Sequence, residues 1–77
     1  MRFEYKYLEL RFGPIKGAVL HDLAEGTETK VGGVTDYGFG LVNALNRLGN
    51  ERWEMCGFAI FNETNVFEYI FKRQISL

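Results

Sequence analysis

Three side chains could together form a catalytic site: the Cys56 thiol as nucleophile, and His21 and Asp22 as a general base and its carboxylate partner. His21 and Asp22 are adjacent, and this is where an imidazole and a carboxylate meet in the sequence. A catalytic pair would also need a nucleophile held in the right geometry. Cys56 lies within an apolar, strand-like segment, where a thiol is usually inert. We therefore expect no catalytic residue, and we keep His21 and Asp22 as candidates for contact with a ligand or partner.

Glycines before the predicted helix suggest a phosphate-binding loop. Gly32-Gly33 and Gly38-x-Gly40 precede the helical pattern, and helix N-termini attract phosphate. The spacing fits neither common motif, because no Gly-Lys follows Gly33 at the required distance and Asn43 stands where a third glycine belongs. Residues 13–38 also carry four acidic side chains against two lysines. We therefore expect these glycines to serve backbone flexibility.

Two arginines stand near the end of the predicted helix, close to Trp53. Arg47 and Arg52 either form a corner that binds a partner or are solvated charges, and the sequence leaves both readings open. Tyr37, just before the helix, is a further candidate for ligand or partner contact. Trp53 itself is expected to anchor the core, because an indole ring buries a large apolar area.

Periodicity places three strands and one helix. Residues 3–10 alternate in a way typical of a strand that ends at Gly13-Pro14. Apolar residues spaced i, i+3, i+4 and i+7 predict a helix over 41–48, with Asp36 as its N-cap and Gly49 as a left-handed C-cap. Further strands are predicted over 53–61 and 66–75, joined by the polar loop 62–65.

Residues 13–40 form a long excursion that holds seven of the nine glycines. One interpretation is a short hairpin with arms Ala18–Leu23 and Thr27–Val31 and a turn at Glu25-Gly26. The other is a helical turn over Val19–Ala24. The sequence does not separate these two alternatives.

The predicted fold class is α+β, with residues 1–77 as a single domain. The order of elements is β-α-β-β: a three-stranded, mainly antiparallel sheet with one helix on one face, plus the glycine-rich excursion. The third strand should lie between the other two and run antiparallel to both, because the helix then connects the first two strands without a direct parallel pair.

Three blocks of the sequence resemble a known family. These are Glu4-Tyr5-Lys6, the segment from Leu45 to Glu54 that reads LNRLGNERWE, and Phe71-Lys72-Arg73. Together they are similar to the bacterial and phage family called domain of unknown function 4177. Arg52 stands where that family usually has glycine, and the excursion is longer than is typical. The resemblance implies the fold and carries no catalytic residues.

The two faces of the predicted sheet differ in character. Phe3, Tyr5 and Tyr7 are expected to join Trp53, Met55 and the aromatic residues of 66–75 under the helix, as core or as a base-stacking platform. The opposite face is expected to expose an apolar patch that monomers rarely leave open. Either the excursion or a second copy covers this patch, and we expect a dimer. The predicted interface residues are Leu8, Leu10, Phe58, Ile60 and Ile70.

Composition excludes several classes of protein. Nine basic residues against ten acidic ones make nucleic-acid binding unlikely, since such binding rests on neutralising phosphates. A single cysteine and a single histidine allow neither an internal disulfide nor a zinc cluster, so we expect no metal and no cofactor. The N-terminus lacks a signal-peptide pattern, and the longest uncharged apolar run, Met55–Phe61, is too short to span a membrane. We expect a cytoplasmic protein.

These observations favour a non-enzymatic interaction module. We expect a homo-oligomer that binds a protein partner, as phage or bacterial accessory and inhibitor proteins do. The alternative is a small-ligand or nucleotide-binding protein, acting as a sponge, with a pocket at the excursion or at a subunit interface.

Overall fold

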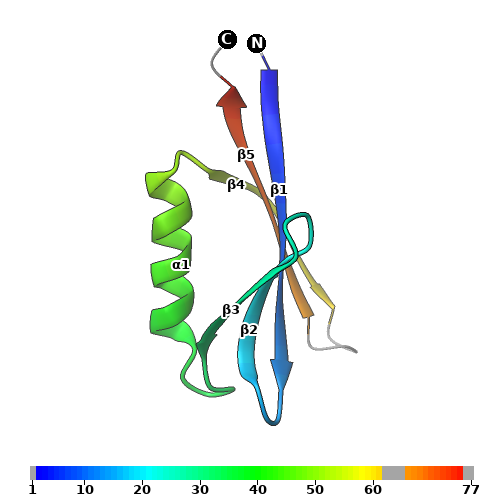
Figure 1. Cartoon of the computed structure of the whole chain (residues 1–77), viewed down its shortest axis with the longest axis vertical. Helices are drawn as coiled ribbons and strands as arrows, with labels where there is room; N and C mark the ends of the chain where they lie inside the picture. The colour runs from blue at the N-terminus through cyan, green and yellow to red at the C-terminus, as the bar shows by residue number, and fades with distance from the viewer. Residues whose placement is uncertain (1, 62–65, 76–77) are drawn as a thin grey trace.

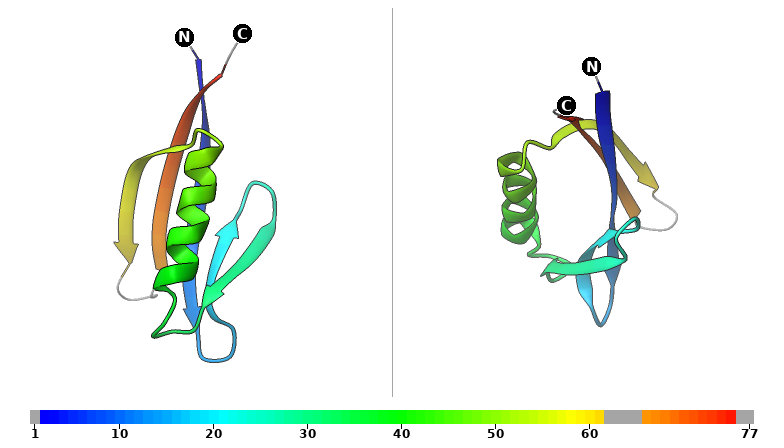
Figure 2. Two further views of the ribbon diagram at one scale, coloured as in Figure 1. Left: turned by 90° about the vertical axis from the view of Figure 1, so that its left-hand side faces the viewer. Right: turned by 45° about the horizontal axis from the view of Figure 1, so that its top comes forward.

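A computed structural model describes residues 2–61 and 66–75 (Figure 1). They form a five-stranded sheet and a helix in the order β1 (Arg2–Gly13), β2 (Gly17–Asp22), β3 (Thr27–Gly32), α1 (Gly38–Asn50), β4 (Glu54–Phe61) and β5 (Val66–Ile75). The order across the sheet is β3-β2-β1-β5-β4, and every neighbouring pair is antiparallel. The sheet curves, and α1 lies on its concave side (Figure 2). Within the described residues, α1 is neither long nor apolar enough for a bilayer crossing.

The prediction of a three-stranded sheet is wrong, although the α+β class is broadly right. The sheet has five strands because the excursion folds as a hairpin whose arms, β2 and β3, extend the sheet beyond β1. This is the hairpin alternative, and the helical turn over Val19–Ala24 is not formed. The order of the three predicted strands is confirmed, since β5 lies between β1 and β4.

Glycines set the two turns of the excursion. Gly17 (φ 76°) and Gly26 (φ 69°) both adopt left-handed backbone, which a residue without a Cβ reaches at little cost. The turn between β2 and β3 is closed by the Gly26 amide, which donates to the Asp22 carbonyl at 2.8 Å. The Asp22 carboxylate also accepts a hydrogen bond from the Glu25 amide at 3.2 Å. The excursion is therefore built from regular structure.

The assignment of faces is right for β5 and for Met55, but it is wrong for β1 and for Phe58 and Ile60 of β4. The register pairs Leu8 with Tyr69 and Leu10 with Phe67, so the even-numbered residues of β1 face α1. Phe3, Tyr5 and Tyr7 point to the opposite, outer face, because side chains alternate along a strand. They were expected under the helix beside Phe67, Tyr69 and Phe71, but the residues that share the inner face with those three are Leu8 and Leu10.

The core lies between α1 and the inner face of the sheet. Its buried apolar members come from four strands: Leu8, Leu10, Ala18, Leu20, Val31, Tyr69 and Phe71. The predicted helix face contacts this set through Leu41, Ala44, Leu45 and Leu48. Leu8 and Leu10, rather than the odd-numbered aromatics of β1, therefore make the centre of the fold.

Both predicted helix caps are wrong. Tyr37 occupies the N-cap position, while the Asp36 carboxylate accepts a hydrogen bond from the Gly33 amide at 2.8 Å. At the other end, Gly49 is helical and Arg52 is left-handed, with φ 72°. The Trp53 amide donates to the Leu48 carbonyl and the Arg52 amide to the Gly49 carbonyl, both at 2.9 Å. This hydrogen-bond pattern is a Schellman motif with Arg52 at the position that favours glycine.

Candidate functional site

His21 and Asp22 do not act as a pair. They are successive residues of β2, so their side chains leave opposite faces of the sheet. Asp22 faces α1, and His21 lies on the outer face with its Nδ1 at 3.4 Å from Glu28 Oε1. Cys56 is exposed on β4, three strand positions from β2 and therefore roughly 14 Å away. The three side chains considered for chemistry lie at three separate places.

Asp22 instead forms a nearly buried ion pair with Lys6. The Lys6 Nζ is 2.8 Å from Asp22 Oδ2, and the two side chains are 14% and 9% exposed. Burial by itself lowers the pKa of Lys6, but the hydrogen bond and charge of Asp22, with Glu25, outweigh it and raise that pKa. Burial by itself raises the pKa of Asp22, but the Lys6 hydrogen bond and backbone amides lower it on balance. Both groups are held in their charged forms.

A polar cavity of about 200 Å³ lies beside this ion pair, between α1 and the β2–β3 hairpin. Arg47, a predicted contact residue, lines it together with Thr27 and Thr29. Tyr37 is placed differently: its ring packs edge-on against Phe12, with centroids 5.0 Å apart. Tyr37 therefore belongs to the periphery of the core.

Two cations contact the ring of Trp53. Lys6 Nζ is 5.2 Å and Arg73 Cζ is 4.3 Å from the centre of its ring. Arg73 also forms an ion pair with Glu4 and donates from Nη1 to the Glu51 carbonyl at 2.9 Å. Residues from all three sequence blocks that carry the family resemblance therefore meet at the end of α1. Arg52 is exposed beside this cluster.

The outer face carries a cluster of titratable groups around Tyr7. Glu9 and Glu68 are directly opposite across β1 and β5, where like charges repel. The Tyr7 hydroxyl donates toward both carboxylates. Its pKa is raised, first by burial and then by its hydrogen bonds to Glu68 and Glu9. Hydrogen bonds from Arg11 and Tyr7 outweigh burial and lower the pKa of Glu9.

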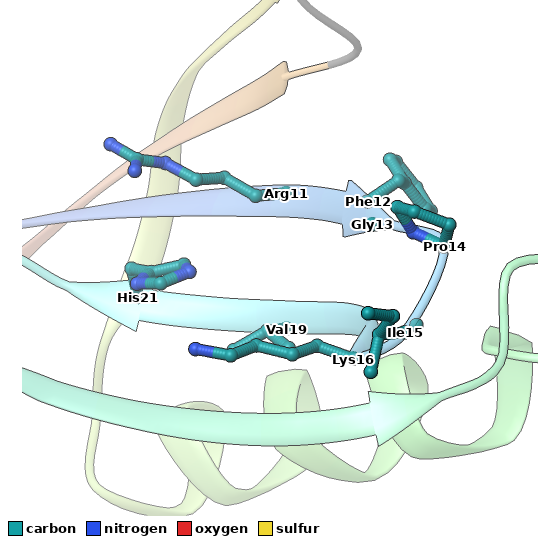
Figure 3. A pocket seen from close by; sticks show the side chains of 9 residues that line it. Arg11, Phe12, Gly13, Pro14, Ile15, Lys16, Val19 and His21 are labelled. Atoms are coloured by element: carbon teal, nitrogen blue, oxygen red, sulfur yellow. The ribbon is translucent and has the colours of Figure 1, made fainter.

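A pocket of about 400 Å³ lies on the outer face beside the turn between β1 and β2 (Figure 3). Arg11, Lys16 and His21 contribute its polar side chains, and Pro14, Ile15 and Val19 are among its apolar ones. Of the predicted candidates, only His21 lies here. Arg11 and Lys16 were missed because their common location depends on the pairing of β1 with β2, which the sequence did not predict.

The predicted interface residues do not form one patch. Leu8 and Leu10 are in the core, with exposed fractions of 4% and 0%. Ile70 lies on the outer face, whereas Phe58 and Ile60 lie on the inner face of the edge strand β4. Phe58 and Ile60 remain about half exposed. Only these two of the five residues share an open apolar surface.

No protein-family model, curated protein or solved structure matches the chain. The resemblance to domain of unknown function 4177 therefore remains an expectation drawn from the three sequence blocks. Within residues 2–61 and 66–75, no group of three or more His, Cys, Asp and Glu side chains is arranged to hold a metal ion.

Proposed function

We propose that this protein is a non-enzymatic, cytoplasmic interaction module whose primary partner is a second copy of itself, bound through the edge strand β4. The observation that carries the proposal is the contrast between the two edges of the sheet. β3 presents charged residues, Glu28 and Lys30, which discourage strand pairing. β4 is uncharged from Met55 to Phe61, and an exposed, uncharged edge strand is a template for pairing.

Side chains on β4 support the same proposal. Met55, Phe58 and Ile60 are 43%, 54% and 50% exposed. Phe58 touches the core only at its margin, with its ring 5.3 Å from that of Tyr69. Burying the exposed part of each side chain would contribute about 1–2 kcal/mol. Because a two-fold interface uses every contact twice, these side chains and the strand hydrogen bonds offset part of the cost of association.

A second copy fits this strand because the uncharged stretch is centred on Phe58. In an antiparallel pair with its twofold axis at Phe58, the regular part of the strand from Gly57 to Ala59 pairs symmetrically, and the uncharged residues flank it up to the irregularity between Met55 and Gly57. The two Phe58 rings then lie across from each other, an arrangement that stabilises strand pairs. The two sheets would join into one continuous sheet with α1 of both copies on the same face.

Light scattering at tens of micromolar tests the proposal. The unmodified protein is expected to have twice the monomer mass, and Phe58→Lys/Ile60→Lys is expected to be a monomer because paired strands would bring lysines together. Ile60→Lys alone serves as a milder variant, since Phe58 also contacts the core. The matched control is Tyr5→Lys, which replaces a strand residue that is 67% exposed on the outer face of β1, and it should remain dimeric.

Circular dichroism establishes that each variant is folded before its mass is interpreted. A monomeric parent protein would refute the proposal directly. A folded double variant that keeps the dimer mass would move the interface away from β4. Loss of the dimer in Tyr5→Lys alone would place the interface on the outer face.

A further inference from the structure

We propose that the pocket beside the β1–β2 turn, here called the turn pocket, binds a small organic phosphate monoester. Its phosphate would lie against Arg11, Lys16 and His21, and its apolar group against Pro14 and Ile15. This inference rests on the pocket alone and is independent of pairing through β4. It also deepens the small-ligand alternative by naming a site and a class of ligand.

The turn pocket is polarised along its length. Figure 3 shows the nitrogen-bearing ends of Arg11, His21 and Lys16 directed toward one end, while Pro14 and Ile15 lie at the other. Lys16 originates in the turn, but its side chain extends along β2 past Val19. A ligand that lies along the pocket therefore meets hydrogen-bond donors at one end and an apolar surface at the other. This polarity suits a molecule with one charged and one apolar part.

The floor and the turn of the pocket are preorganised. Val19 is 7% exposed, so the floor is fixed by the fold. Gly17 holds a left-handed conformation, and a Cβ there would come 2.5 Å from the Gly32 carbonyl oxygen. The turn is therefore locked against the end of β3. A site that is ordered before binding loses less conformational entropy when the ligand arrives.

Two carboxylates stand beside the pocket, and both are engaged with its cations. Glu9 Oε1 accepts hydrogen bonds from Arg11 Nε and Nη2, at 3.1 Å and 2.5 Å. These bonds use two of the five N–H groups of the guanidinium, so three remain for a ligand. Glu28 lies 3.4 Å from His21 Nδ1 and 4.0 Å from Lys16 Nζ. The Lys16–Glu28 pair is well exposed, and such pairs contribute little, so Lys16 can turn to a ligand.

The donor set favours phosphate over a neutral or cationic group. Arginine presents a planar fork that matches oxyanions, and lysine adds a point charge. His21 can donate to a ligand through Nε2–H, since its Nδ1 faces Glu28. Lys30 lies on the neighbouring β3, in a smaller adjoining pocket with Lys16. Lys30 pairs with Val19 across β2 and β3, so it adds a cation beside the middle of the turn pocket, and Glu28 shares the adjoining pocket with it.

The test is a titration of the ¹⁵N-labelled protein with phenyl phosphate, followed by the amide signals of Gly17, Val19 and His21. Saturable shifts centred on these residues are expected, with a Kd on the order of 1 mM or below. Inorganic phosphate lacks the apolar part and phenol lacks the charge, so each is expected to bind at least about tenfold more weakly. No saturable shift with phenyl phosphate would overturn the inference, as would equal binding of phenol.

Exposed residues supply the variants, so the fold should survive each change. Arg11→Gln and Lys16→Gln are each expected to weaken phenyl phosphate binding by about three- to tenfold. Ile15→Ser, at a side chain that is 93% exposed, should weaken phenyl phosphate but leave inorganic phosphate unchanged. The control is Lys72→Gln, which removes the same charge from the outer face of β5 and should bind normally. Equal weakening in Lys72→Gln would show a diffuse charge effect and overturn the site.

Discussion

Gly40 of α1 lies directly against the backbone carbonyl of Val31 in β3, where a Cβ on residue 40 would overlap the carbonyl oxygen. The helix therefore approaches the sheet more closely than any residue with a side chain would allow. This contact explains why a glycine is kept in the first turn of a helix, where it weakens helix formation by about 1 kcal/mol relative to alanine.

The first prediction compares two glycines of the same helix. Gly40→Ala is expected to destabilise the protein by about 2–3 kcal/mol, because overpacking against Val31 outweighs the better helix propensity. Gly49→Ala, where a Cβ meets no atom within 4 Å, should stabilise it by about 0.5–1 kcal/mol. Urea denaturation followed by circular dichroism measures both. Equal effects at the two positions would contradict the close approach of α1 to β3.

A second prediction concerns the left-handed residue that ends the helix. Left-handed backbone costs an L-residue about 1–2 kcal/mol, whereas a new glycine adds flexibility to the unfolded chain worth about 0.4–1 kcal/mol. Arg52→Gly should therefore raise the free energy of unfolding by about 0.5–1 kcal/mol. Glu51→Gly is the control: its φ is −89°, so glycine brings no relief there and should destabilise. If both changes destabilise alike, Arg52 contributes contacts that compensate for its conformation.

Trp53 is expected to hold α1 to the sheet. Trp53→Ala should lower the free energy of unfolding by about 3–5 kcal/mol, since the ring packs against the core and contacts the Lys6 and Arg73 cations. Trp53→Phe keeps an aromatic ring, so its free energy of unfolding should fall clearly less than that of Trp53→Ala. Circular dichroism is the appropriate probe, because Trp53 is the sole tryptophan and both variants lose its fluorescence. A melting temperature that is unchanged in Trp53→Ala would show that the ring contributes little to the fold.

Stability should fall in acid through Asp22. Its pKa in the folded protein is below the ordinary value of about 3.9, so the unfolded chain takes up a proton first as the pH falls. The stabilisation is therefore present above about pH 4 and is lost as the pH falls through the folded-state pKa. Glu9 acts in the same direction. Lys6, whose pKa is raised, contributes stability below about pH 10 that disappears at higher pH.

Substitution separates the Asp22 contribution from that of Glu9. Asp22→Asn should cost about 3 kcal/mol at pH 7, because it leaves the nearly buried Lys6 ammonium without its anion. Its stability should also depend less on pH between about 5 and 3. Adding Lys6→Met should recover much of the loss, since removing both charges is often close to neutral. If the free energy of unfolding falls equally with decreasing pH in Asp22→Asn and in the parent protein, other carboxylates cause the loss of stability in acid.

The sequence predicted the elements correctly where the hydrophobic pattern extended over many residues, but it was misleading about which face of β1 is buried. The helix and the strands β1, β4 and β5 follow from runs of alternating or helical spacing, and their order in the sheet follows from connection rules. Which side of β1 faces the helix depends on pairing with β5, and both faces contain apolar residues. Leucine is fully buried more often than tyrosine, so residue type favoured Leu8 over Tyr7, but the larger area of the aromatic rings favoured the opposite face.

The hairpin was harder to predict because its strands have unusual composition. β2 is buried on both faces and uses small residues such as Gly17 and Ala18, whereas β3 is an edge strand that is largely exposed through Thr27–Lys30. Neither alternates clearly. The turn pocket depends on the pairing of β2 with β1, which brings Lys16 and His21 beside Arg11. The left-handed role of Arg52 had a signal in the sequence, since the resembled family has glycine at that position.

The location of β5 in the sheet has a consequence for the order of assembly. β1 and β2 are joined by a short turn, and so are β2 and β3, but β1 meets β5 only after every other element has been made. During synthesis, Leu8 and Leu10 must therefore lie on a strand with one open edge until β5 emerges. The β4–β5 hairpin then docks onto β1 across the longest loop closure of the fold, and such closures slow folding. Until β5 is made, the edge of β1 that it will cover is unpaired, and an unpaired edge is a template for pairing with another chain.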